Sequence, residues 1–127
     1  MEKFEKKGME EKGIAHVLAA FGYSMAGLKV LFRESAARLE AVLFLAATIL
    51  FYLSGASLVQ YGILAALLVG LLCVEALNTA IELIVDKTSP ERSDYAKQAK
   101  DLGSFAVFCG LTVFCGYSAW VVIGGIV

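Results

Sequence analysis

Apolar residues fill two long stretches of the chain that contain no charged residue. These stretches run from 41 to 74 and from 102 to 127. A transmembrane helix needs about 20 consecutive apolar residues, so the first stretch holds most of two spans and the second holds one. The pattern therefore predicts three membrane-spanning helices, at about 36–53, 58–84 and 102–127.

Residues 14–33 show a different pattern, in which apolar residues recur at steps of three and four. They are Ile14, Val17, Leu18, Phe21, Met25, Leu28 and Phe32. This spacing is typical of an amphipathic helix, which we expect to lie in the membrane interface, the alternative being that it packs against a neighbouring helix. Residues 1–13 mix Lys and Glu with little to bury, and predict a flexible charged N-terminus. We expect one membrane domain over 14–127.

Polar segments mark the connections between the predicted spans. Residues 54–57, Ser-Gly-Ala-Ser, are expected to form the first turn. Ser89, Pro90 and Glu91 predict the start of the next helix, because Ser caps free N–H groups, Pro suits the first turn and Glu suits the positive end of the helix dipole. The predicted fold class is an all-α membrane protein with an N-terminal surface helix and three spans.

The overall composition supports a membrane protein. Of 127 residues, 59% are hydrophobic and 18% are charged, whereas soluble domains average about 45–50% and about 25%. The net charge of -1 argues against nucleic acid as the main partner, which requires a basic excess. Cys73, Cys109 and Cys115 lie in apolar stretches without the spacing of a zinc site, so we expect them to be small buried residues.

The distribution of Lys and Arg predicts the orientation in the membrane. Seven of the 11 lie in the N-terminal segment up to residue 38 and four lie between residues 86 and 101, whereas the connection at 54–62 has none. Basic loops stay on the cytoplasmic side. We therefore expect the N-terminus and the 86–101 segment to face the cytoplasm.

A ladder of polar residues ends the second predicted span. Its members are Glu75, Asn78, Glu82 and Asp86, which on a helix fall within about a quarter of the circumference. Glu75 lies just inside the apolar region, where an ionisable group is a functional candidate by default. The ladder therefore predicts a cation-binding stripe at the cytoplasmic edge of the membrane.

The chemistry of this stripe suits a phosphoryl transfer. Mg²⁺ usually takes one or two protein carboxylates, which Glu82 and a partner such as Glu34 can supply. Lys100 can provide a positive charge for phosphate, and Glu75 can accept a hydroxyl proton. The residues also allow a small proton-coupled transporter that uses Glu75, or a membrane assembly subunit without chemistry.

Two sequence motifs bring in a known family. Residues 75–86, EALNTAIELIVD, and residues 99–104, AKDLGS, closely resemble the signature of the bacterial integral-membrane diacylglycerol kinases, a family that includes undecaprenol kinases. The resemblance extends to 22–24 and 34–40 and covers the chain from about residue 14 to its end. It implies a homotrimer in the bacterial cytoplasmic (inner) membrane, with active sites shared between subunits. It also implies an ATP-dependent, Mg²⁺-requiring lipid kinase, with Gly103-Ser104 favouring diacylglycerol as the acceptor.

The same resemblance implies roles for individual residues. Glu75 is expected to be the catalytic base and to contact the lipid, and Glu34 and Glu82 are expected to bind metal and ATP. The further residues expected to place the nucleotide are Tyr23, Asn78, Glu91, Lys100 and Asp101. The further residues expected near the lipid are Arg38, Glu40 and Ser104. The sequence departs from the usual family pattern at His16 and at Arg92-Ser93.

Overall fold

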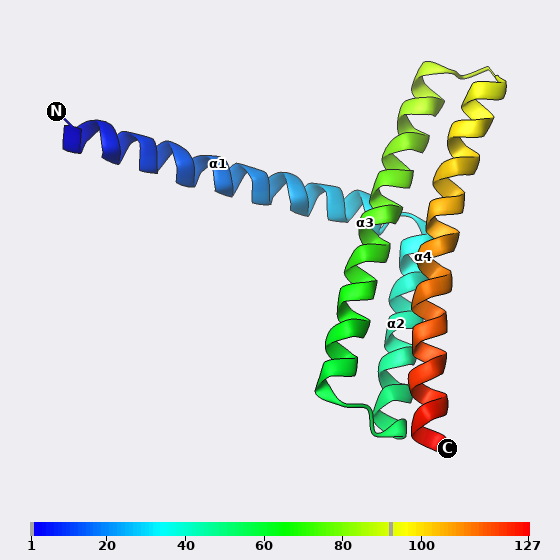
Figure 1. Ribbon diagram of the computed structural model, residues 1–127. Coiled ribbons are helices and arrows are strands. Elements are labelled where there is room, and N and C mark those ends of the chain that lie inside the picture. Colours follow the sequence, from blue (N-terminus) through cyan, green and yellow to red (C-terminus); the bar gives the residue numbers. More distant parts are fainter. Residues whose placement is uncertain (1, 92) are drawn as a thin grey trace.

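A computed structural model describes the backbone of residues 2–91 and 93–127, and the side chains of residues 12–91 and 93–127. Its helices are α1 (Glu2–Leu31), α2 (Ser35–Ser54), α3 (Leu58–Thr88) and α4 (Asp94–Ile126). The described residues contain no strand, which confirms the all-α class. Helices α2, α3 and α4 form a bundle, and α1 projects sideways from it (Figure 1).

The turn between α2 and α3 forms where the sequence predicts it. Gly55 ends α2 with a φ of 71°, a left-handed conformation that glycine adopts without steric cost. Ser57 then caps α3: its hydroxyl accepts from the Gln60 N–H at 3.3 Å, and the Gln60 side chain accepts from the Ser57 N–H at 2.7 Å. This reciprocal capping box fixes the first turn of α3.

The connection between α3 and α4 differs from the prediction. Helix α3 continues to Thr88, and Ser89 is its C-terminal cap, donating its backbone N–H to the Val85 carbonyl. Helix α4 starts at Asp94, where the Ser93 hydroxyl accepts from the Ala96 N–H at 3.1 Å. The predicted start at Ser89 to Glu91 is therefore wrong, because Ser93 and Asp94 supply the capping hydroxyl and the first-turn acid instead.

The core of the bundle lies among α2, α3 and α4 on the side of the α2–α3 turn. It consists of Ala47, Phe51, Leu64, Leu71, Phe114 and Val121. The Phe51 ring meets the rings of Tyr61 and Tyr117 edge-on, at centroid distances of 5.6 and 6.1 Å. The Tyr117 hydroxyl donates to the Gln60 carbonyl at 3.2 Å. These contacts pack the end of the bundle near the α2–α3 turn.

The outer faces of the bundle carry many large apolar side chains. Large exposed side chains include Leu45, Ile49, Val69, Val113 and Trp120. Each of the four helices contains a stretch that is long and apolar enough to cross a membrane, which in α1 runs from Lys12 to Leu31. An apolar surface of this extent needs a lipid or protein environment, as expected for a membrane protein.

Helix α1 leaves the bundle at a short elbow before α2, formed by residues 32–34. It begins at Glu2, so helical backbone extends through the segment that we expected to be flexible, whose side chains up to residue 11 lie outside the described ones. The predicted apolar positions Ile14 and Phe21 are exposed. Near its C-terminus α1 contacts α3, and Gly27 and Leu31 line an apolar groove between the two helices. This contact attaches α1 to the bundle.

Candidate active site

A cavity of about 250 Å³ lies where the elbow before α2 meets α3 and α4. We call it the carboxylate cavity. The expected site residues that line it are Glu34, Glu75, Asn78, Glu82 and Ser104. They come from the elbow, from α3 and from α4, and the start of α2 borders the cavity as well. The bundle therefore brings together residues up to seventy positions apart in the sequence.

The polar residues of α3 form one stripe whose burial decreases toward the α3–α4 connection. Glu75 and Asn78 are 4% and 8% exposed, Glu82 is half-buried and Asp86 is exposed. Helices α3 and α4 extend past the start of α2 (Figure 1), which explains why the later members of the stripe lose their cover. The environment of each carboxylate thus depends on its position along α3.

Asn78 is held between Glu82 and α4. Its Nδ2 donates to Glu82 Oε1 at 3.1 Å. On the other side it lies against Gly103, where an added Cβ would be 2.0 Å from Asn78 Oδ1. The missing side chain at Gly103 is therefore what makes room for Asn78, and Asn78 in turn orients Glu82.

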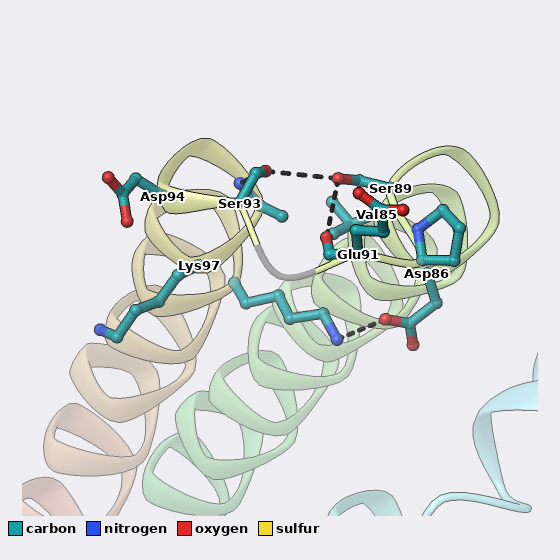
Figure 2. Close-up of a pocket in the computed structure, with 10 residues that line it drawn as sticks. Val85, Asp86, Ser89, Glu91, Ser93, Asp94 and Lys97 are labelled. Atoms are coloured by element: carbon teal, nitrogen blue, oxygen red, sulfur yellow. Dashed lines mark hydrogen bonds and ion pairs between the residues drawn. The ribbon is translucent and has the colours of Figure 1, made fainter.

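A second pocket of about 530 Å³ surrounds the α3–α4 connection, and we call it the loop pocket (Figure 2). Asp86, Glu91 and Lys100 line it, and Lys100 Nζ donates to Asp86 Oδ1 across the two helices. The Ser89 hydroxyl donates to the Glu91 carbonyl at 3.2 Å and lies 3.3 Å from the Ser93 hydroxyl. These bonds tie the connection together at the mouth of the pocket.

Four of the expected site residues line neither cavity. Tyr23 is exposed on α1. Asp101 accepts from Lys97 on the exposed side of α4. Arg38 donates to backbone carbonyls of the elbow. Glu40 is 2% exposed within α2, and neither of its carboxylate oxygens has a hydrogen-bond partner in the described part of this chain.

The structure adds Thr79, for which the sequence predicts no role, and shows unexpected contacts of Asp86 and Gly103. Thr79 is buried and lines the carboxylate cavity. Its position, four residues after Glu75, places it on the same side of α3, so spacing alone indicates it. Asp86 belongs to the predicted stripe, but its pairing with Lys100 depends on how α3 and α4 align. Gly103 acts through the space it leaves, which no sequence pattern reveals.

Sequence comparisons identify the relatives of this chain. The sequence profile of prokaryotic diacylglycerol kinase matches residues 22–123. The chain belongs to the prokaryotic diacylglycerol kinase family. A diacylglycerol kinase of a Sinorhizobium species is 47% identical over 114 residues, covering 90% of this chain and 83% of the relative. The Pseudomonas aeruginosa diacylglycerol kinase is 38% identical over 115 residues, covering 90% and 94%.

Other members of the family are more distant but still align over most of the chain. The Escherichia coli diacylglycerol kinase is 32% identical over 102 residues, covering 80% of this chain and 84% of its own. Membership confirms the resemblance seen in the two motifs and identifies the chain as a lipid kinase with membrane-spanning helices. A proton-coupled transporter and an assembly subunit without chemistry are thereby set aside.

Proposed function

We propose that this protein transfers the γ-phosphate of ATP to the primary hydroxyl of diacylglycerol and so forms phosphatidate. The observation that carries the proposal is the carboxylate cavity, where Glu34, Glu75 and Glu82 converge beside Asn78. The name shared by its relatives, diacylglycerol kinase, supports this lipid as the acceptor. Undecaprenol is the alternative acceptor within the same chemistry.

Glu75 is suited to be the general base. It is 4% exposed, and its Oε2 has no hydrogen-bond partner among the described residues, so this oxygen is free to accept a proton. In the proposed step the lipid hydroxyl oxygen forms a bond to the γ-phosphorus while the bond to the bridging oxygen of ADP breaks. The hydroxyl proton moves to Glu75. Such transfers depend mainly on positioning and charge stabilisation.

The residues of the cavity fit a divalent cation of the Mg²⁺ type. Among the described side chains, no three His, Cys, Asp or Glu residues gather closely enough to enclose a metal. Mg²⁺ needs only one or two carboxylates, since water and substrate phosphates complete its shell. Glu34 and Glu82 would hold it, with Asn78 orienting Glu82. When bound, Mg²⁺ would neutralise charge on the transferred phosphate.

The loop pocket is suited to the nucleotide. It lies on the same helix as the cavity but nearer the α3–α4 connection. Lys100 there donates one N–H to Asp86 and has two further N–H donors for phosphate oxygens. Glu91 lines the same pocket. We expect Tyr23 and Asp101, which lie outside it, to contribute only after the nucleotide or another subunit is bound.

We further propose that α2, α3 and α4 span a bacterial inner membrane and that α1 lies along its cytoplasmic surface. The sideways direction of α1 (Figure 1) and the exposure of its apolar positions support this arrangement. The apolar outer faces of the bundle support assembly into a homotrimer, and we expect Glu40 and Ser104 to lie near the lipid.

The test is to give the purified protein Mg·ATP with diacylglycerol or with undecaprenol and to measure the phosphorylated lipid. We expect phosphatidate, and we expect Glu75→Gln to reduce turnover by about 10²- to 10⁴-fold, the usual contribution of a general base, while still binding an ATP analogue. Absence of product from both lipids, or full turnover in the variant, would contradict the proposal. Product from undecaprenol alone would change the acceptor.

A further inference from the structure

A side chain from α2 bonds to the backbone of the elbow between α1 and α2. The backbone N–H groups of Phe32, Arg33 and Glu34 donate to the last turn of α1, at 3.0, 3.1 and 3.0 Å. Their own carbonyls follow the end of α1 and need other donors, because the last carbonyls of a helix have no partner within it. Arg38 Nη1 donates to the Phe32 carbonyl at 3.2 Å and to the Arg33 carbonyl at 2.7 Å.

The position of Arg38 suits this bridge. Side chains on a helix lean toward its N-terminus, so Arg38 extends from the first turn of α2 back to the elbow. Its positive charge also lies at the carbonyl end of α1, where the helix dipole favours a cation. Hydrogen bonds from a charged donor are the stronger kind, so one guanidinium can define the angle at which the chain turns.

Glu34 is the residue that depends on this turn. It occupies the N-cap position of α2 with an extended backbone, φ −73° and ψ 139°, yet its side chain makes no capping hydrogen bond. Its carboxylate is therefore not used for the helix and lines the carboxylate cavity instead. The direction of that carboxylate follows from the path of the backbone through the elbow.

We propose that Arg38 is a positioning residue that holds Glu34 in place for metal binding, by bridging the carbonyls of Phe32 and Arg33. This role differs from the lipid contact that the family resemblance implies for Arg38. It rests on the proposed function only in taking Glu34 as a metal ligand. The inference predicts that loss of Arg38 weakens the metal site and leaves the affinity for the lipid unchanged.

The test measures metal binding directly. Wild type, Arg38→Gln and Arg38→Lys are titrated with Mn²⁺ in the presence of a non-hydrolysable ATP analogue, and free Mn²⁺ is followed by electron paramagnetic resonance. Arg33→Gln is the matched control, since it removes the same charge from the same elbow but keeps the carbonyl. We expect the Kd for Mn²⁺ to rise about tenfold or more in Arg38→Gln, as for other residues that orient a metal ligand.

The KM values separate the two roles of Arg38. An unchanged KM for diacylglycerol with a raised Mg²⁺ requirement supports positioning, whereas a raised KM for diacylglycerol with wild-type Mn²⁺ binding overturns it. Equal effects in Arg33→Gln also overturn it. Arg38→Lys keeps a charged donor for the carbonyls and should retain more of the affinity than Arg38→Gln. If Arg38→Gln does not fold by circular dichroism, Arg38→Met, which has no donor, is titrated in its place, and a wild-type Kd there refutes the inference. Failure of the proposed function is seen separately, as an inactive wild type.

Discussion

Replacing Gly103 with alanine tests whether the contact between Asn78 and Glu82 serves catalysis. The new Cβ would lie 2.0 Å from Asn78 Oδ1, about 1.3 Å closer than an ordinary C···O contact of about 3.3 Å. Asn78 is buried, so it cannot move aside into solvent. Either its amide group rotates or α3 and α4 separate, and both movements disturb the hydrogen bond from Nδ2 to Glu82 Oε1.

The size of the effect follows from that hydrogen bond. A hydrogen bond to a charged group contributes about 1.5–3 kcal/mol, which corresponds to about 10- to 150-fold in rate if the transition state needs it. Overpacking a buried site costs about 1–3 kcal/mol of stability. We expect Gly103→Ala to lose stability near the lower end of this second range, because the obstructing atom is the end of a side chain. The loss of transition-state stabilisation should therefore exceed the loss of folding free energy.

The assay is ADP release with diacylglycerol in mixed micelles, together with thermal unfolding. Gly110→Ala is the matched control: it lies two turns further along the same face of α4, and its Cβ would meet Leu71 Cδ1 at 2.9 Å. We expect the control to show a similar loss of stability with near wild-type kcat. Equal kcat in the two variants would refute a special role for the space at Gly103.

Three further predictions follow from the pockets, the capping box and the buried acid. Lys100→Met should raise the KM for Mg·ATP about tenfold, whereas Lys87→Met should not, as measured by ATP titration. Ser57→Ala should lower the free energy of unfolding by about 1 kcal/mol without changing kcat, because the bond from the Gln60 N–H is lost far from the site. Glu40→Gln should raise the thermal midpoint, because burying an unpaired carboxylate is costly; a lower midpoint would contradict this. It should also raise the KM for diacylglycerol, because Glu40 is expected to lie near the lipid.

The sequence predicts the helices well where local chemistry decides their ends. Gly55 and Ser57 act within one turn of themselves, and the turn between α2 and α3 forms as predicted. The start of α4 was missed because Ser89 and Ser93 are both competent caps four residues apart. Contact with α4 favours an α3 that continues to Thr88, past the predicted end of the span at about residue 84. That contact is not visible in the local sequence.

The candidate site was likewise predictable where one helix decides the spacing of its residues, and not where separate helices pack together. Glu75, Asn78 and Glu82 were predicted together because a single helix fixes their spacing. Lys100 and Asp101 were paired by the motif, yet successive residues on a helix point about 100° apart. In the structure Lys100 accordingly contacts Asp86 and Asp101 contacts Lys97. The addition of Glu34 and Ser104 depends on packing between elements. Metal chemistry suggested Glu34 as a possible partner of Glu82, whereas only the family resemblance indicated a role for Ser104.

In the proposed site, the layout of α3 would separate nucleotide binding from catalysis. Glu75 and Asp86 are eleven positions apart, or about 16 Å along the helix axis at 1.5 Å per residue. A nucleotide held at the loop pocket must therefore extend along α3 for its terminal phosphate to reach Glu75. Changes near Asp86 and Lys100 should then act mainly on the KM for ATP, whereas changes at Glu75 or Gly103 should act mainly on kcat. A kcat effect at both ends of the stripe would mean that the nucleotide lies elsewhere.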